Sequence, residues 1–408
     1  MVIGKLRHPR GLAPASAEAL LSASNVPGLR QSFQAKLPAI ADGAPLYVSN
    51  VSTLSGTKDL LFVTTETGDI IALDAHTGAQ VWIDQNPANG CSINNGSSPC
   101  YTTSSPVLDP NRQYVYSYGL DGKVHKYQVG DGAEITTGGW PETATIKDFD
   151  EKGSSALAVA TAGGVSYLYV TNSGYPGDGG NYQGHVTAIN LANGNPLDSY
   201  TPANFQSLQN NDQDLGSTDV AILPVPSGSN VAHLAIQGGK DAKLRLLNLD
   251  NLSGQGGLGH TGGEITTINV PQGNEVLTQS AVWLDGSGTT WVFVANDNGI
   301  SGLKLTLTNG TPGLQKVWQS GSGGTSPIVA NGVLYDAGSG AIRALNPGTG
   351  KQLWQGSIGG IHWQSPIVAN GILYIADNNS YLTAFAVPAY PTPNPNLTPQ
   401  AYLPLVGN

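Results

Sequence analysis

The stretch that decides the fold is residues 324–356, GTSPIVANGVLYDAGSGAIRALNPGTGKQLWQG. Its short apolar runs are closed by Asn331-Gly332, by Gly-Ser-Gly at 338–340 and by Pro-Gly-Thr-Gly at 347–350, and the last run carries Trp354. Short runs rich in Val, Ile, Leu and Tyr, separated by glycine-containing turns, are typical of antiparallel strands. We therefore predict an antiparallel meander of four strands in this stretch.

The same pattern restarts at once, because residues 364–385, QSPIVANGILYIADNNSYLTAF, repeat Ser-Pro-Ile-Val-Ala-Asn-Gly-x-Leu-Tyr. Recurrence of one supersecondary unit indicates a repeat architecture in which neighbouring units bury each other's faces. Matching first strands begin at residues 44–47, 105–108, 155–158, 218–221, 280–283, 326–329 and 365–368. Matching third strands occur at residues 70–74, 124–128, 186–190, 244–249, 302–307, 341–346 and 381–386. Tryptophan marks the fourth strand most clearly at positions 82, 318 and 354.

The two ends of the repeat array complete each other. The last unit stops at Val387 after its third strand, whereas residues 31–37, QSFQAKL, read as an isolated strand in which Phe33 takes the place of the repeat's tryptophan. Pairing these two ends closes a ring and leaves no exposed sheet edge at its ends. We predict an all-β fold, a seven-bladed propeller of four-stranded antiparallel blades over 31–387, closed by the N-terminal strand.

Two flanking segments lie outside the ring. Residues 1–30 form an N-terminal extension without a periodic signal, in which residues 15–21 could make two helical turns that nothing caps. Residues 388–408 form a proline-rich tail, expected to be an extended linker or a disordered end. Its ending, AYLPLV, also leaves open a sorting or docking tag.

Composition excludes several classes of function. Charged residues make up only 11% of the 408-residue chain, 54 residues are glycine, and the net charge is −10 with basic residues scattered singly. A nucleic-acid partner would need a clustered basic face, so none is expected. No apolar run approaches the length of a membrane span, and no apolar signal-peptide core follows Lys5, Arg7 and Arg10.

The repeats follow the pattern Leu-Tyr-Val and then Ala-Leu-Asp-x-x-Thr-Gly-x-x-x-Trp, and residues 60–82, LLFVTTETGDIIALDAHTGAQVW, match it closely, with Leu-Phe-Val in the first place. Together with 332–354 and 361–385, they resemble the quinoprotein-like (PQQ-like) propeller repeat, a WD-like repeat unit. That family includes quinone-dependent alcohol dehydrogenases as well as non-enzymatic assembly propellers, so the resemblance implies the fold and leaves the activity open.

The dehydrogenase members imply eight blades, a bound calcium and two adjacent cysteines against the quinone. Here the repeat count is seven, and Cys91 and Cys100 are separated by eight residues. The two cysteines could form a disulfide in an oxidising compartment or remain two thiols. We therefore expect no cofactor, with PQQ and calcium as the alternative.

Residues that precede the first strands should face one rim of the central channel. They are Thr103, Ser104, Ser154, Ser217, Gln279, Thr325, His362, Trp363 and Gln364. This lining of hydroxyls and amides would suit a neutral polar ligand, and the ring of Trp363 could stack on a sugar. The alternative is that Ser and Thr satisfy backbone groups at strand ends in every blade.

A glycine-rich insertion at residues 174–185 is the most unusual stretch, and it contains the ligand candidates Asp178, Tyr182 and His185. Oxygens of Asp178 and Asn181 could help to hold calcium, although a calcium site normally needs several carboxylates. No metal site is therefore expected, and no arrangement of catalytic residues is visible. His185 is expected to be a hydrogen-bonded structural residue.

These patterns favour an exported non-enzymatic propeller, extracellular, cell-surface or periplasmic, that acts as a binding or scaffold module. Its partners would be proteins or glycans, and self-assembly is a further option. The alternatives are a PQQ-dependent oxidoreductase and a lectin-like carbohydrate binder.

Overall fold

The structure is a computed structural model of the chain. The residues it describes are 18–85, 102–146, 156–162, 165–172, 185–189, 200–211, 220–256, 259–338, 340–388 and 401–402, with the single positions 148, 153, 213 and 218.

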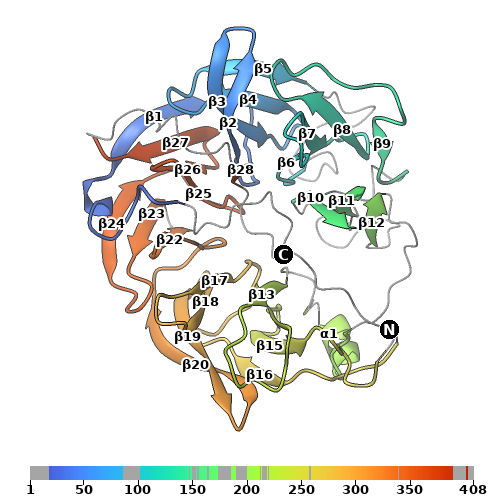
Figure 1. Cartoon of the computed structure of the whole chain (residues 1–408), viewed down its shortest axis with the longest axis vertical. Helices are drawn as coiled ribbons and strands as arrows, with labels where there is room; N and C mark the ends of the chain where they lie inside the picture. The colour runs from blue at the N-terminus through green and yellow to red at the C-terminus, as the bar shows by residue number, and fades with distance from the viewer. Residues whose placement is uncertain are drawn as a thin grey trace.

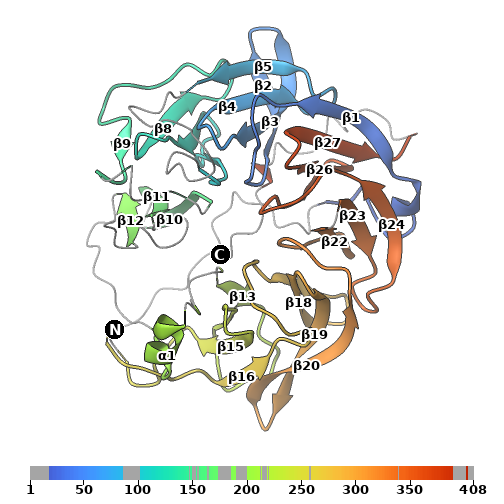
Figure 2. The same cartoon turned by 180° about the vertical axis from the view of Figure 1, so that it is seen from behind.

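The described residues form seven antiparallel sheets arranged around a ring (Figures 1 and 2), which we number as blades 1 to 7 in chain order. Blade 1 contains β2 (Leu46–Thr53), β3 (Gly56–Thr64), β4 (Ile70–Asp74), β5 (Gln80–Asp84) and the additional strand β28 (Ala401–Tyr402). Blade 2 contains β6 (Val107–Leu108), β7 (Tyr114–Tyr118), β8 (Lys123–Gln128) and β9 (Glu142–Thr143). Blade 3 contains β10 (Ala158–Ala162), β11 (Val165–Asn172) and β12 (His185–Ile189).

The remaining blades continue in the same order. Blade 4 contains β13 (Ala221–Leu223), β14 (Leu234–Gln237), β15 (Lys243–Asn248) and β16 (Thr266–Asn269). Blade 5 contains β17 (Ala281–Leu284), β18 (Thr290–Asn296), β19 (Gly299–Thr308) and β20 (Thr311–Ser320). Blade 6 contains β21 (Ile328–Ala330), β22 (Val333–Gly338), β23 (Ala341–Leu345) and β24 (Gln352–Ser357). Blade 7 contains β25 (Ile367–Ala369), β26 (Ile372–Ala376), β27 (Tyr381–Ala386) and β1 (Arg30–Lys36).

The ring is closed by the N-terminal strand, as the sequence predicts. β1 is the outer strand of blade 7 and pairs antiparallel with β27, with Phe33 opposite Ala384 and Lys36 opposite Tyr381. Phe33 also takes the role of the repeat's tryptophan, because its ring packs on Gly78 of blade 1, where an added Cβ would lie 2.5 Å from that ring. The first and last repeats are therefore joined by both backbone pairing and side-chain packing.

The tryptophans of the outer strands connect each blade to the next. The indole Nε1 of Trp82 donates to the carbonyl of Val129 at 3.1 Å, and that of Trp318 donates to Pro347 at 2.7 Å. Trp354 in blade 6 makes the equivalent bond, at 3.0 Å, to the carbonyl of Leu29, directly before β1. The chain entering β1 therefore replaces the turn that the other blades offer to this side chain.

The apolar core lies between the faces of neighbouring blades. Separate clusters of buried side chains join blade 7 to blade 1, blade 1 to blade 2, blade 2 to blade 3, blade 4 to blade 5, blade 5 to blade 6, and blade 6 to blade 7. Tight hairpins make these faces possible: Asn331 and Gly332 both have positive φ, 44° and 71°, as the Asn-Gly turn predicts.

The described part of the N-terminal segment is mainly irregular chain. Residues 18–21 are not helical, and the only regular structure before β1 in the described part of the segment is a 3₁₀ turn at Val26–Gly28. Leu21, Val26 and Leu29 are buried against blades 6 and 7. The Glu18 carboxylate accepts the backbone N–H of Gly371 at 3.0 Å, so irregular chain is tied to the ring by hydrogen bonds rather than by a helix.

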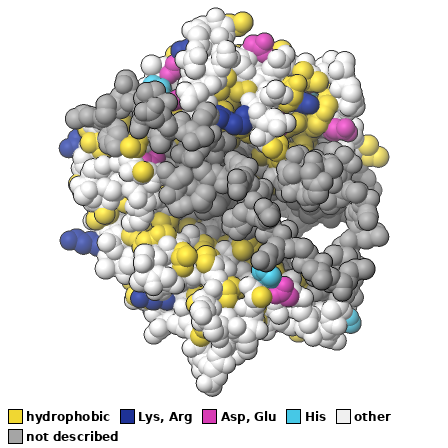
Figure 3. Space-filling model, in the orientation of Figure 1, with side chains coloured by type: hydrophobic (Ala, Val, Ile, Leu, Met, Phe, Trp, Pro, Cys, Tyr) yellow, Lys and Arg dark blue, Asp and Glu magenta, His cyan; other side chains and the backbone are white. Residues whose placement is uncertain are grey.

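The described surface agrees with the composition. In the view of Figure 3, Lys and Arg lie as separate side chains rather than as one patch. The one α-helix of the described residues, α1 (Phe205–Asn210), has six residues, and no described helix is long and apolar enough to cross a membrane.

Replacing Phe33 by alanine tests the closure of the ring. Phe33→Ala removes the ring that packs between blades 7 and 1 and should lower the free energy of unfolding by about 2–3 kcal/mol, less than for a fully buried phenylalanine because Phe33 is only partly buried. Urea denaturation followed by tryptophan fluorescence measures this change. Phe205→Ala, on the partly exposed helix α1, is the control and should change stability by less than about 0.5 kcal/mol. Equal losses in both variants would contradict the closing role of Phe33.

Candidate functional site

The predicted rim residues lie in the connections that lead from one blade into the first strand of the next. His362, Trp363 and Gln364 lie together before β25, whereas Thr103 precedes β6 and Gln279 precedes β17. The rim therefore brings three of the predicted ligand residues into one place and distributes the others over separate blades.

The rim hydroxyls bind backbone groups of neighbouring blades. The Ser105 hydroxyl accepts the N–H of Ala44 at 2.8 Å, and the Ser326 hydroxyl accepts the N–H of Gln279 at 3.0 Å. Thr325 Oγ1 donates to the carbonyl of Trp363 at 3.1 Å, which links blade 6 to blade 7. These contacts match the alternative interpretation of the sequence, in which small hydroxyls satisfy strand-end backbone groups.

Asp42 organises the rim where blade 7 meets blade 1. Its side chain is fully buried, and one carboxylate oxygen lies 2.7 Å from Nδ1 of His362. The other oxygen accepts the backbone N–H of Trp363 at 3.1 Å. The hydrogen bond to Asp42 raises the pKa of the half-exposed His362. This bond holds the imidazole in one orientation while the side chain remains accessible to solvent.

Further side chains complete this rim cluster. The His362 N–H donates to Oε1 of the buried Gln364 at 2.7 Å, and Gln364 Nε2 donates to Oδ1 of Asn378 at 2.7 Å. Burial, followed by the nearby charge of Asp42, raises the pKa of Glu66. Two aromatic rings, His362 and Trp363, are thus presented to solvent on a fixed polar support, with Trp363 37% exposed.

Several predicted residues lie outside the described residues, namely Cys91, Cys100, Ser154, Asp178, Asn181, Tyr182 and Ser217. The disulfide, the calcium ligands and the glycine-rich loop therefore stay predictions. His185 begins β12 and is paired with Asn172 of β11.

The described rim carries no free carboxylate at Asp42 for a calcium ion. Calcium takes six or more oxygen ligands, usually with several carboxylates among them. Both carboxylate oxygens of Asp42 are already bound to His362 and Trp363, and the described residues contain no group of three His, Cys, Asp or Glu side chains that could hold a metal ion. We derive no oxidoreductase step from this rim.

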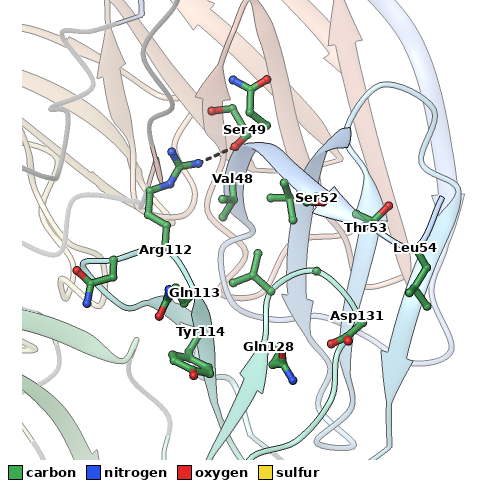
Figure 4. Close-up of a pocket in the computed structure, with 15 residues that line it drawn as sticks. Val48, Ser49, Ser52, Thr53, Leu54, Arg112, Gln113, Tyr114, Gln128 and Asp131 are labelled. Carbon is green, nitrogen blue, oxygen red and sulfur yellow. Dashed lines mark hydrogen bonds between the residues drawn. The ribbon is translucent and has the colours of Figure 1, made fainter. Parts of the chain in front are cut away.

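A second site, which the sequence did not reveal, is a groove between blades 1 and 2 (Figure 4). Its volume is about 660 Å³, within the usual range of ligand pockets. One wall is the β2–β3 hairpin, and the others are the β6–β7 and β8–β9 turns. The lining residues are 48–54, 111–114 and 128–131.

Arg112 is the cationic side chain of the groove. Its Nη2 donates to the carbonyl of Ser49 at 2.6 Å, as the dashed line in Figure 4 shows, while its buried Nε has no hydrogen-bond partner within the described structure. Burial lowers the pKa of Arg112, but an arginine keeps its charge because its reference pKa is so high. The positive charge of Arg112 would attract a carboxylate or a peptide carbonyl that enters the groove.

The walls of the groove are held rigidly. The Asp109 carboxylate accepts the backbone N–H groups of Asn111, Gln113 and Tyr114, at 3.1, 2.6 and 2.7 Å, and fixes a turn in which Arg112 has a φ of 61°. Such a positive φ in a residue other than Gly, Asn or Asp is uncommon and tends to occur at functional sites. The geometry of this turn is therefore set before any ligand binds.

The opposite wall carries an apolar tip. Asp59 accepts the N–H of Asn50 at 2.8 Å and stabilises the bulge at the base of the β2–β3 hairpin. At the tip of that hairpin, Leu54 is 95% exposed beside the polar groove. A fixed cation next to a protruding leucine is suited to a protein surface rather than to a small enclosed ligand.

Sequence reasoning missed both Asp42 and Arg112. Each lies in an irregular connection, and neither belongs to the repeat pattern on which the predictions rest. One available signal was Asp109-Pro-Asn-Arg-Gln, since Asp at the start of a turn is a hydrogen-bond acceptor for the following backbone.

Comparisons with known proteins agree with this architecture. A family model described as outer membrane protein assembly factor BamB matches residues 48–291 and 304–388. No curated protein matches the chain at a significant level. The solved quinohemoprotein alcohol dehydrogenase ADHIIG from Pseudomonas putida HK5 is similar at 10% identity and a TM-score of 0.57, over 94% of this chain and 80% of that chain.

Two further solved structures are similar. A europium-containing methanol dehydrogenase has 14% identity and a TM-score of 0.56, over 90% of this chain and 94% of that chain. BamB from Moraxella catarrhalis has 13% identity and a TM-score of 0.42, over 89% of this chain and 99% of that chain. At these identities, the likeness to the two dehydrogenases shows the propeller fold alone.

The raised pKa of His362 predicts a pH-dependent contribution to stability. Since the folded pKa lies above the unfolded value of about 6.5, this contribution is fully present below about pH 6 and is lost as the pH rises through the folded pKa. His362→Gln should therefore lower the urea midpoint more at about pH 5.5 than at about pH 8.5. His233→Gln is the control, because the pair that His233 makes with Asp250 is exposed and screened by solvent, and it should change the midpoint by less at either pH. An equal loss at both pH values would contradict the Asp42–His362 interaction.

Proposed function

Because the chain belongs to the family described as outer membrane protein assembly factor BamB, we propose that it is a non-enzymatic binding module of the cell envelope that docks protein partners. The family match and the repeat pattern support a PQQ-like propeller of the BamB type. The docking role, the envelope location and the identity of the docking surface are the proposal.

The observation that carries the proposal is Arg112 in the groove between blades 1 and 2. Its guanidinium is held in place by the carbonyl of Ser49, and its charge is the one positive charge among the residues that line the groove. Arginine is enriched at the energetically dominant positions of protein interfaces because its planar donors bind carboxylates and carbonyls in pairs. An acidic or carbonyl-presenting segment of a partner is the chemistry that fits this position.

The surroundings of Arg112 favour a protein partner. The exposed Leu54 lies at one end of the groove, and Gln113 and Gln128 present exposed amides along its other walls. The ring of Tyr114 is supported by Lys126 Nζ at 4.0 Å from its centroid. The apolar, aromatic and amide groups that surround Arg112 reproduce the composition of a protein interface. The proposed module needs no resident cofactor.

Carbohydrate binding at the rim is a second candidate, favoured by the exposed Trp363 on its fixed polar support. A pyranose could stack on the indole while the neighbouring His362 and Asn378 meet its hydroxyl groups. Titration with soluble oligosaccharides should quench tryptophan fluorescence saturably, and Trp363→Ala should abolish this quenching. The same quenching in Trp363→Ala, or none in the unmodified chain, would exclude this candidate.

Site-specific photocrosslinking in the source organism tests the docking proposal. A photoreactive phenylalanine analogue at Gln113, in the groove, should give a discrete protein adduct, whereas the same analogue at Lys316, on the exposed edge strand β20, should not. An adduct at twice the chain mass would identify a second copy as the partner.

The role of Arg112 is tested in the same experiment. Arg112→Gln should reduce the groove adduct by roughly tenfold, the scale of one lost charged contact at an interface, while the charge-matched Lys316→Gln should leave it unchanged. Urea midpoints of both variants serve as the folding control. An adduct that is insensitive to Arg112→Gln would overturn the assignment of this groove.

A further inference from the structure

Part of the C-terminal tail forms a strand that the sequence did not predict. β28 pairs antiparallel with β2, with Ala401 opposite Val48 and Tyr402 opposite Tyr47. It makes blade 1 the only blade with a fifth strand among the described residues. Figure 1 places β28 towards the centre of the ring, and it also lies next to β25 of blade 7. The tail therefore meets the ring at the same seam that β1 closes.

β2 has a reason to accept such a strand. It contains eight residues, whereas the first strands of the other blades contain two to five in the described structure. A short edge offers few free backbone groups, but a long one is a template for pairing with another chain. Of the inner strands described, β2 is therefore the longest, and its first residues are the part that β28 covers.

The available part of this edge is sharply limited. The carbonyl of Ser49, next after Val48, is bound by Arg112, and the N–H of Asn50 is bound by Asp59. A strand can therefore pair only with the beginning of β2, up to Val48. This is the section that β28 occupies. Arg112 thus also sets the register of the acceptor edge.

The tail has a matching restriction. Pro399 and Pro404 lack the backbone N–H group that a paired strand donates. A strand in this part of the tail is therefore limited to the residues between the two prolines. Residues 388–408 contain no Asp, Glu, Lys or Arg. The strand that fits the acceptor edge is therefore short, uncharged and bounded by proline.

We propose that the channel-facing edge of β2 is a strand-acceptor site for a short uncharged peptide, and that β28 (Ala401–Tyr402) is its displaceable occupant in cis. A partner segment with the same chemistry binds by replacing the tail strand, as in other cases of strand addition to an open sheet edge. This site adjoins the docking groove, since Val48 lines the groove and Arg112 contributes to both.

Peptide binding to a truncated chain tests this proposal. The variant lacks residues 399–408, and the probe is a fluorescein-labelled peptide of residues 397–408, LTPQAYLPLVGN. Fluorescence anisotropy should show saturable binding to the truncated chain and binding roughly tenfold or more weaker to the full chain, since a tethered occupant acts at a millimolar effective concentration. A peptide with Ala401→Pro and Tyr402→Pro is the control and should not bind.

Hydrogen exchange gives an independent readout. Truncation should speed amide exchange in residues 46–48 and leave β3 and β4 unchanged, whereas general loosening of blade 1 would speed all three strands. No peptide binding to a normally folded truncated chain, or equal binding to both chains, would overturn the proposal. A concentration-dependent dimer that requires the tail would overturn occupancy in cis. If the peptide does not bind the truncated chain, the crosslink at Gln113 is still expected, so the two proposals are tested independently.

Discussion

The pairing of β1 with β27 is the constraint on which the rest of the structure depends. It joins residues that are about 350 positions apart and converts a row of sheets into a ring. The Asp42–His362 contact follows from it, because Asp42 precedes blade 1 and His362 precedes the first strand of blade 7. An open array would place these two side chains at opposite ends. The polar cluster at the rim is therefore a product of closure and not of any local motif.

The candidate binding sites lie around blade 1. The groove with Arg112 lies between blades 1 and 2, the Asp42 cluster lies between blades 7 and 1, and β28 adds to the inner edge of blade 1. Elsewhere on the described rim, the hydroxyls of residues such as Thr325 and Ser326 serve the backbone of the neighbouring blade. The repeat thus provides the frame, and departures from it provide the groups that a partner could recognise.

This division explains what could be predicted from the sequence. The turns at Asn331-Gly332, the tryptophan positions and the closing strand with Phe33 all follow from local patterns, and the structure confirms them. Asp42 and Arg112 could not be found in this way, because their partners, His362 and Ser49, are distant in the chain and become neighbours only when blades assemble. The burial of the segment leading to Leu29 could not be predicted for a related reason: the segment is irregular chain, which has no periodicity.

The bond from Trp354 to the carbonyl of Leu29 has a consequence for how the chain folds. Both this bond and the β1–β27 pairing join residues that are more than 300 positions apart in the sequence. Contacts of such large sequence separation form late, since the entropy of closing a long loop must be met before the contact exists. Until blade 7 is complete, β1 remains an unpaired strand. The unpaired edges of β1 and β27 are therefore most exposed to misassembly while the ring is still open.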